Sequence, residues 1–446
     1  MRFRLGLTVG IVVALLAAAG AAYVVTNQHN QHAPARTATA PPARTAVMLD
    51  LAATATEPTT TSISAVLRHA LVRTGLGPSI AGEVIDESTG RRLFARHPAL
   101  ALAPASTLKL LTATAALTVL PANDTLTTGV VRSGNTLYLV GGGDVTLTAT
   151  PQPGYPATAT LRDLAAQTAA AIGSGAHLRL RYDVGDWTGP TLATGWTSSY
   201  LTSGNVSRLT ALEVNEARLT SGATAPRAMD PAQQAADAFR RELTKAGVDV
   251  AGRSRPAAAP SSGLGVASVE SPTIPALVQH MLTTSDNDLA EALGRMVADR
   301  LGFPATFTGA ADAVRTAVGK LGVPTHGLRL YDASGLSRLD RVTPDTLAAL
   351  LRVATHDQRL ASLIAGLPVA AFTGTLADRY EHGSARTGAG VVRAKTGTLS
   401  GVNALAGEVV NADGRLLLFA FIADHVPDPE TGESALDRLA AALGST

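Results

Sequence analysis

Two kinds of hydrophobic periodicity divide the chain, from about Ser62 onward, into strands and helices. Alternating apolar residues bounded by turn residues predict strands, and apolar residues at three- and four-residue spacing predict helices. The strands expected near the two ends of the chain are 80–85, 92–96, 391–398, 404–410 and 416–422. The helices expected between and after them are 106–120, 274–282, 289–301, 344–355 and 433–443. This order predicts an α+β domain built from both ends of the chain.

The middle of the chain, residues 122–265, follows a different pattern. Short strand-like runs such as 137–140 alternate there with turns rich in glycine, threonine and aspartate. One clear helix, 231–245, has Asp230 as its expected N-cap and a proline at its first position. We therefore predict an inserted domain at 122–265. It interrupts a main domain made of residues 62–121 and 266–446.

The N-terminal segment, 1–25, has the features of an export signal. Arg2 and Arg4 precede an uncharged apolar run of 21 residues, which is long enough to span a bilayer. Ala19-Gly20-Ala21 offers a cleavage site, so the segment is either a signal anchor or a signal peptide, and its length favours the anchor. The rest of the chain would then face outward. Residues 26–61, rich in alanine, threonine and proline, predict a solvated linker.

The composition excludes several classes of function. With 37 basic and 35 acidic residues the chain is nearly neutral, whereas nucleic-acid binding requires a concentrated basic surface. The absence of cysteine rules out disulfides, thiolate catalysis and cysteine-ligated metals. Histidine, aspartate and glutamate show no spacing typical of metal ligands, so we expect neither a metal nor another cofactor.

Lysine is rare in this chain, with four among the 37 basic residues. Arginine stays protonated in proteins, whereas lysine loses its proton where the surroundings disfavour the ammonium. Lys245 and Lys320 each stand two residues before a glycine after a helix-like run, where a cation suits the negative helix end. Lys109 and Lys395 have no such explanation, so each marks a candidate site of chemistry.

The first candidate element is Ser106-Thr107-Leu108-Lys109. Positions i and i+3 share a face of a helix, so the Ser106 hydroxyl and the Lys109 amine would meet. The apolar neighbours Leu110 and Leu111 would favour the neutral amine, which activates a serine by taking its proton. The Ser106 backbone N–H would also face a developing oxyanion. The alternative is a serine helix cap followed by a lysine with no role.

Two further elements would complete such a site. Lys395-Thr396-Gly397-Thr398 ends a strand, where glycine admits a substrate backbone and the other three side chains suit a carboxylate. An edge strand protected by a lysine is the alternative. Ser285-Asp286-Asn287 lies between two helices and equally suits an ordinary N-cap cluster. The similar triplets Ser133-Gly134-Asn135 and Ser203-Gly204-Asn205 have the pattern of glycine turns in the insertion, and we assign them no role in the site.

In this order, S-x-x-K, S-x-N and K-T-G resemble the active-site set of penicillin-recognising serine enzymes. Residues 62–446 further resemble the class C low-molecular-mass penicillin-binding proteins, which are the D-alanyl-D-alanine carboxypeptidase/endopeptidase family. The segments that carry this resemblance are Pro104-Ala105-Ser106-Thr107, Gly142-Gly143-Asp144, Asp332-Ala333-Ser334-Gly335-Leu336-Ser337-Arg338 and Gly374-Thr375-Leu376. The family also has a large insertion after S-x-x-K, and here 179 positions separate Ser106 from Ser285. Ala333 stands where we expect glycine from the family.

The resemblance implies a fold and a reaction. The fold is a penicillin-binding or β-lactamase-like transpeptidase domain of the α+β class, a five-stranded antiparallel sheet with helices, interrupted by the large mixed insertion. The reaction is hydrolysis of D-Ala-D-Ala bonds in peptidoglycan stem peptides through an acyl-enzyme. It takes place outside the cytoplasm, needs no metal, and is inhibited by β-lactams, which acylate the same serine.

The resemblance also implies a role for each motif residue. Ser106 would be the nucleophile, Lys109 the general base, and Ser285 the relay that carries a proton to the leaving amine with help from Lys395. Asn287 would hold the substrate amide. The residues Thr396, Gly397 and Thr398 would bind the substrate, with the two threonines on its terminal carboxylate. The backbone N–H groups of Ser106 and Thr398 would form the oxyanion hole, and Asp286 would be structural.

Other functions share part of this pattern. A serine β-lactamase has the same three elements, but it is usually compact, with a shorter gap between the first two and no anchor, linker or insertion. A non-catalytic cell-wall-binding scaffold would have no need of a lysine beside a serine. An esterase with a G-x-S-x-G elbow is disfavoured, because Ser106 lacks both flanking glycines. Carboxypeptidase and endopeptidase activity both stay open at this point.

Overall fold

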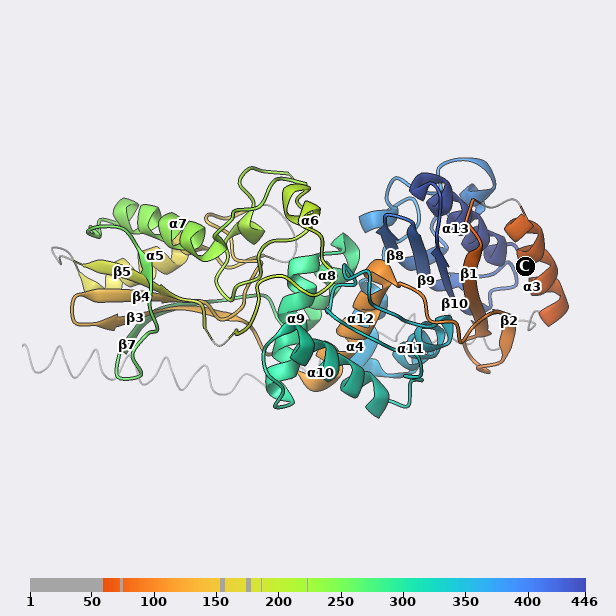
Figure 1. The fold of residues 1–446 in the computed structure, drawn as a ribbon, viewed down its shortest axis with the longest axis horizontal. Coiled ribbons are helices and arrows are strands. Elements are labelled where there is room, and N and C mark those ends of the chain that lie inside the picture. The colour runs from red at the N-terminus through yellow and green to blue at the C-terminus, as the bar shows by residue number, and fades with distance from the viewer. Residues whose placement is uncertain (1–58, 73–74, 153–156, 174–177, 186, 223) are drawn as a thin grey trace, which may run out of the picture. The chain divides into compact units, whose positions relative to one another are not determined.

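The computed structural model describes residues 59–446, apart from 73–74, 153–156, 174–177, 186 and 223 (Figure 1). The helices are α3 (Thr60–Val72), α4 (Lys109–Val119), α5 (Leu161–Ile172), α6 (Ser199–Thr202), α7 (Pro231–Lys245), α8 (Ile274–Thr284), α9 (Asn287–Arg300), α10 (Phe307–Lys320), α11 (Pro344–His356), α12 (Ala361–Ala365) and α13 (Pro429–Gly444). The short 3-10 helices are η1 (Ala105–Leu108), η2 (Asn215–Ala217), η3 (Gln358–Leu360), η4 (Gly374–Leu376) and η5 (Gly383–Gly388). The strands are β1 (Ser79–Asp86), β2 (Arg92–Arg96), β3 (Thr127–Ser133), β4 (Thr136–Val140), β5 (Arg179–Asp183), β6 (Arg255–Pro256), β7 (Leu264–Glu270), β8 (Val392–Leu399), β9 (Val402–Val410) and β10 (Leu416–Asp424).

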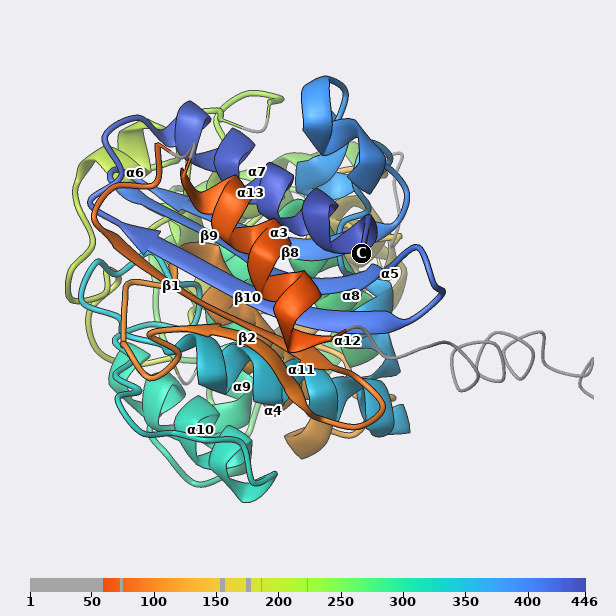
Figure 2. The same ribbon diagram turned by 90° about the vertical axis from the view of Figure 1, so that its right-hand side faces the viewer.

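The first sheet joins the two ends of the described chain. Its strand order is β2-β1-β10-β9-β8, and every neighbouring pair is antiparallel. Figure 2 shows α3 and α13 crossing one face of this sheet. Helix α11 packs against β10 and β1 from the other side, with α4 beside it. The predicted α+β class, with five antiparallel strands and helices, is confirmed.

The central strand β10 is apolar along nearly its whole length because both of its faces are covered. Leu417, Phe419 and Phe421 belong to the core beneath α3 and α13. Leu418, Ala420 and Ile422 belong to the core shared with α4 and α11. The strand therefore separates two hydrophobic layers and holds them in register.

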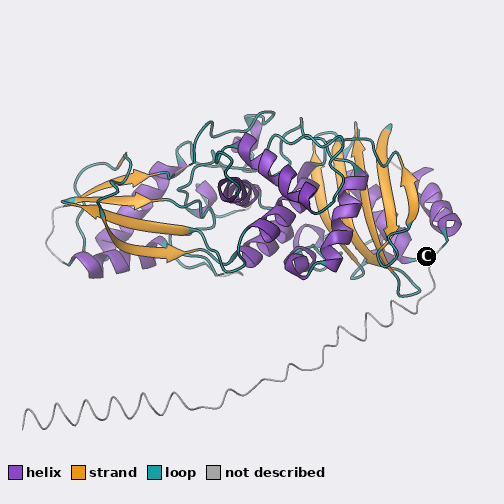
Figure 3. Cartoon of the chain, turned by 90° about the horizontal axis from the view of Figure 1, so that it is seen from below, coloured by secondary structure: helices purple, strands orange, loops and turns teal. Residues whose placement is uncertain are grey.

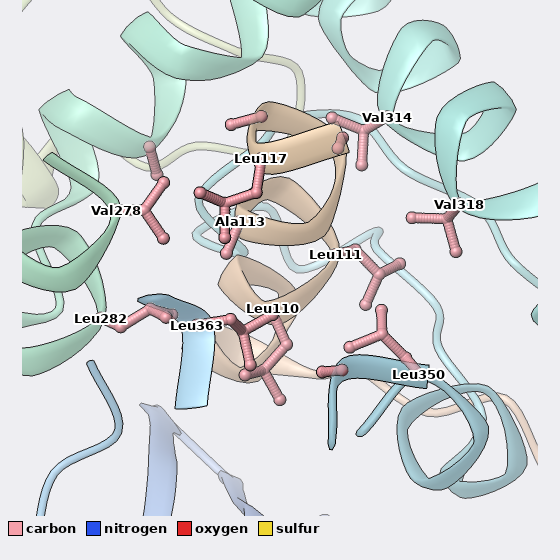
Figure 4. Packing of buried hydrophobic residues seen from close by; sticks show 14 of the residues in the cluster. Leu110, Leu111, Ala113, Leu117, Val278, Leu282, Val314, Val318, Leu350 and Leu363 are labelled. Carbon is pink, nitrogen blue, oxygen red and sulfur yellow. The ribbon is translucent and has the colours of Figure 1, made fainter. Parts of the chain in front are cut away.

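Helix α4 is enclosed by other helices and by the sheet. Every residue from Lys109 to Leu117 is buried. Figure 4 shows Leu110, Leu111 and Ala113 among side chains of the surrounding helices, which include α8, α10 and α11. A helix that is apolar on every side belongs in the interior. Its first residue, Lys109, is consequently fully buried too.

Side-chain caps begin several helices where the sequence predicts them. Asp230 accepts a hydrogen bond from the Gln233 N–H at the start of α7, and Thr343 accepts one from the Thr346 N–H at the start of α11. The predicted helix 106–120 instead begins as η1 and continues as α4. Helices α3 and α5 were not predicted, although both have buried apolar residues on one side.

The second sheet has the order β6-β5-β4-β3-β7. Strands β4, β5 and β6 are parallel, whereas β3 is antiparallel to both β4 and β7. Leu139 and Leu180 of this sheet pack in one core with Phe239 of α7 and Leu164 of α5. Figure 3 shows the strands with these two helices behind them. The predicted division at 122–265 stays a prediction, and β7 runs past its second boundary.

The N-terminal predictions lie mostly outside the described residues. The segment 1–25 and the linker up to residue 58 are not part of the described structure, while α3 begins inside the predicted linker, at Thr60. None of the described helices has the length and apolar character needed to cross a bilayer.

Ala333, where the family resemblance leads us to expect glycine, is accommodated by a glycine opposite. Its methyl group lies against Gly294 of α9, where an added Cβ would stand 2.7 Å from the Ala333 Cβ and 3.3 Å from the Ala310 Cβ. Packed carbon atoms do not approach so closely, so the side chains at 294 and 333 must share one methyl-sized space.

We expect Gly294→Ala to destabilise the protein, because the new methyl would overfill this space. Overpacking of a core costs about 1–3 kcal/mol, which outweighs the gain in helix propensity of about 1 kcal/mol. Thermal unfolding followed by circular dichroism measures the effect. Ala333→Gly combined with Gly294→Ala should recover most of the loss, and equal losses in the single and double variants would contradict the shared space.

Candidate active site

Ser106 lies in η1 and Lys109 begins α4, and their side chains meet as the i, i+3 spacing predicts. Lys109 Nζ donates a hydrogen bond to Ser106 Oγ over 3.1 Å. The preceding residue, Ala105, has a left-handed backbone with φ of 47°. This tight entry is packed against Gly335, where an added Cβ would stand 2.0 Å from the Ala105 carbonyl oxygen. Residue 335 must therefore be glycine if the backbone at Ala105 and Ser106, here called the serine turn, is to keep this position.

Lys109 is fully buried and makes two further hydrogen bonds. Its Nζ donates to Asn287 Oδ1 over 2.6 Å and to the Ser334 carbonyl oxygen over 2.8 Å. Burial lowers the pKa of Lys109 to about 8, although the carboxylates of Asp332 and Asp286 oppose the shift. A side chain in this state exchanges its proton near neutral pH, as a general base requires.

Ser285 and Lys395 form a second pair of hydroxyl and amine. Ser285 terminates α8 with a left-handed backbone, φ 61°, which turns its side chain into the site. Lys395 Nζ donates to Ser285 Oγ and to the Thr396 carbonyl oxygen, both over 2.9 Å. Burial, followed by the nearby charge of Lys109, lowers the pKa of Lys395 well below its ordinary value.

The segment Thr396-Gly397-Thr398 runs along β8 directly beside the serine turn. A Cβ at Gly397 would stand 2.8 Å from the Pro104 carbonyl oxygen and 3.1 Å from the Ser106 nitrogen, so a larger residue would displace the turn. The hydroxyl groups of Thr396 and Thr375 lie 2.8 Å apart. Thr398 Oγ1 donates to Glu433 Oε1 over 2.7 Å, a partner that the motif did not predict.

These motifs line one cleft of about 830 Å³. Ser106, Ser285, Asn287, Thr396 and Thr398 all contribute to its wall. Tyr200, Asn205 and Glu216, from the predicted insertion, line the same cleft, and so do Arg379 and Glu433 beyond the end of the K-T-G segment. The structure therefore brings together all three sequence motifs and adds residues from both flanks.

The wall behind Lys109 is held by two carboxylates. Glu291 Oε1 accepts hydrogen bonds from the backbone N–H groups of Ala333 and Ser334, over 3.0 and 2.9 Å. The Asp332 carboxylate accepts from the N–H groups of Gly335 and Ser337, over 2.7 and 2.6 Å. These bonds direct the Ser334 carbonyl toward Lys109. The family resemblance marked the Asp332 segment, whereas no motif marked Glu291.

Asn287 has a partner that the sequence analysis missed. Its Nδ2 donates to the Asn205 carbonyl oxygen over 2.7 Å, while its Oδ1 accepts from Lys109. Asn205 belongs to the Ser203-Gly204-Asn205 turn, to which we assigned no role in the site. That prediction is wrong, because the turn contributes a backbone carbonyl to the cleft. A backbone contact leaves no trace in side-chain identity.

Among the described residues, one group of carboxylates has the spacing to hold a metal ion: Glu216, Asp286 and Asp288. Two guanidinium groups already neutralise it, since Arg218 pairs with Glu216 over 2.6 Å and Arg227 pairs with Asp288 over 3.4 Å. Burial, followed by Glu216 and Asp288, raises the pKa of Asp286 to about 8. Asp286 also caps α9 by accepting from the Leu289 N–H over 2.9 Å, as predicted.

A serine that accepts a hydrogen bond from a buried lysine, beside a second Ser–Lys pair formed between the end of α8 and the antiparallel sheet, defines a serine hydrolase of the acyl-enzyme type. The sequence matches the model of the D-Ala-D-Ala carboxypeptidase 3 (S13) family over residues 64–229 and 219–443. The chain therefore belongs to this family. It is a serine-type D-Ala-D-Ala carboxypeptidase that acts on the cell wall outside the cytoplasm.

Individual relatives agree with this assignment. The chain is 35% identical to "Carboxypeptidase DacB" of Mycolicibacterium smegmatis, over 98% of this chain and 96% of that protein. It is 30% identical to the "D-alanyl-D-alanine carboxypeptidase" of Actinomadura sp., over 75% of each chain. Its fold is similar to the crystal structure of penicillin binding protein 4 (dacB) from Haemophilus influenzae. That match has a TM-score of 0.72 at 21% identity and covers 85% of this chain and 99% of the other.

We expect the rate of acylation by a penicillin to follow the protonation of Lys109. A protonated amine cannot accept the serine proton, so the rate should rise about tenfold per pH unit below a pH of about 8 and then level off. Stopped-flow measurement of acylation between pH 5.5 and about pH 9.5 determines the profile. A flat profile across this range would exclude Lys109 as the titrating group.

Proposed function

We propose that Ser106 attacks the carbonyl carbon of a D-Ala-D-Ala bond while Lys109 accepts its proton. The fully buried Lys109 amine, 3.1 Å from Ser106 Oγ, is the observation that carries this proposal. Its pKa of about 8 leaves a substantial neutral fraction at physiological pH, and the serine needs no other base. The backbone N–H groups of Ser106 and Thr398 bind the oxyanion that forms on the substrate.

Collapse of the tetrahedral intermediate requires a proton on the leaving amine. In this proposal the Ser285 hydroxyl, in the same cleft as Ser106, donates its proton to the amine and takes one from Lys395, from which it accepts a hydrogen bond. The proton that Lys395 gives up balances the one that Lys109 accepted from Ser106. Asn287 binds the substrate amide, and the hydroxyl groups of Thr396 and Thr398 bind the terminal carboxylate. Water then hydrolyses the ester on Ser106 and regenerates the enzyme.

Endopeptidase activity on cross-linked stem peptides is the second function that we propose. Arg379 and Glu433 also line the cleft, whose volume of about 830 Å³ leaves room for a leaving group larger than a single D-alanine. A β-lactam would acylate Ser106 through its strained amide. A complex of the Haemophilus influenzae protein with a β-lactam has a fold similar to this chain, with a TM-score of 0.67. We further propose that residues 1–25 anchor the enzyme to the membrane.

Labelling with a fluorescent penicillin tests the nucleophile. We expect an adduct on Ser106, located by peptide mass, that is absent in Ser106→Ala. Lys109→Ala should slow its formation by about 10²–10⁴-fold, the usual contribution of a general base. Lys320→Ala is the matched control, since this lysine ends α10 and is absent from the cleft lining. Rapid turnover of the penicillin by the wild type would instead identify a β-lactamase. A folded protein that does not react with the penicillin would support the alternative of a non-catalytic cell-wall-binding scaffold.

We also expect Glu433→Gln to lower the KM for peptides that end in D-Ala-D-Ala. The glutamine still accepts the Thr398 hydroxyl, while one negative charge disappears from the place where the substrate carboxylate binds. Two like charges about 4 Å apart repel by about 1 kcal/mol when water fully screens them, which is roughly fivefold in KM, and by more where the cleft excludes water. Steady-state release of D-alanine measures the change. An increased KM would assign Glu433 a different part in substrate binding.

A further inference from the structure

The side-chain amide of Asn287 has two different ends, and each has its own partner. Oδ1 accepts the hydrogen bond from Lys109 over 2.6 Å, and Nδ2 donates to the Asn205 carbonyl oxygen over 2.7 Å. If the amide turned over, its N–H groups would face the Lys109 amine and its oxygen would face a carbonyl. The Asn205 carbonyl therefore determines which end of Asn287 meets the buried lysine.

The position of this carbonyl depends on the residue before it. The Gly204 carbonyl oxygen accepts two hydrogen bonds from Arg227, from Nε over 3.1 Å and from Nη2 over 2.9 Å. Gly204 has φ of 71°, and a Cβ there would stand 2.5 Å from the Ala225 carbonyl oxygen. The turn at Gly204 therefore packs closely against the segment that carries Arg227. The two hydrogen bonds from the guanidinium to the Gly204 carbonyl fix the position of this turn.

The same guanidinium reaches the residue after Asn287. Arg227 Nη1 forms an ion pair with Asp288 over 3.4 Å and a hydrogen bond with the Glu216 carbonyl oxygen. Asp288 Oδ1 in turn accepts from the Ser207 N–H over 2.8 Å. The Arg227 side chain is 2% exposed and that of Asp288 is 1% exposed, so water does not compete with these bonds.

We propose that Arg227 is a positioning residue for the acylation step. It ties Gly204 to Asp288, the immediate neighbours of Asn205 and Asn287, and so keeps Asn287 Oδ1 directed at Lys109. On this view Gly204, Asn205 and Arg227 belong to the active site. The inference rests on the proposed roles of Ser106 and Lys109 and adds the contacts that orient Asn287 toward Lys109.

The test uses Arg227→Lys, which keeps a charge for Glu216 and Asp288 but cannot make two parallel bonds to one carbonyl. We expect acylation by a penicillin to slow at least tenfold, with a smaller change in the non-covalent binding constant. Arg240→Lys is the matched control, because Arg240 also donates to a glycine carbonyl, that of Gly252, over 2.9 Å, on the exposed side of α7. It should leave acylation unchanged.

A second comparison separates positioning from loss of stability. In an Asn287→Ala background, Arg227→Lys should cause no further slowing, because the group it orients is gone. Equal slowing in both backgrounds, or no slowing in either, would overturn the inference. If Arg227→Lys fails to fold, Asp288→Ala, which releases the Ser207 N–H, replaces it in the same cycle.

One readout does not depend on catalysis. The Asn287 side-chain N–H groups, assigned by NMR with Asn287→Ala, should exchange with solvent at least tenfold faster in Arg227→Lys than in the wild type. Unreactive wild-type protein would contradict the proposed function, while the exchange rates would still decide the inference. Unchanged exchange would overturn it even if the enzyme were active.

Discussion

The burial of a single amine, Lys109, is the constraint on which the site depends. An ammonium group with no access to water is costly, so its pKa falls to about 8 and its hydrogen bonds must all come from the protein. Ser106, Asn287 and the Ser334 carbonyl supply them. The apolar surroundings of α4 that produce this burial are the same contacts that hold the main hydrophobic core together.

Each hydrogen-bond partner of Lys109 is in turn positioned by contacts with other residues. Glu291 and Asp332 hold the segment that carries the Ser334 carbonyl, and the Trp196 indole donates to Asp332 over 2.7 Å. The close contact at Gly335 fixes the serine turn. These supports come from distant parts of the sequence, so the geometry around one amine requires the whole fold. Such a site is preorganised, because its dipoles are in place before a substrate arrives.

Acidic side chains are unusually prominent around this basic centre. Burial raises the pKa of Glu291 to about 8, and that of Asp286 is raised to a similar value. Two lysines, Lys109 and Lys395, are fully buried near these acidic side chains, and burial lowers the pKa of both.

The sequence by itself predicted the five strands of the main domain, most of its helices and the three motifs, because hydrophobic periodicity, N-cap residues and rare lysines are local signals; it gave no range for α3, α10 or α12. The strands at both ends of the chain, the cap of α7 and the helix that starts with Pro344 were all found in this way. The tertiary structure alone decided which distant residues complete the site. Glu433 beside Thr398, Glu291 behind Ser334 and the Asn205 carbonyl on Asn287 carry no pattern, since their positions follow from strand register and helix packing.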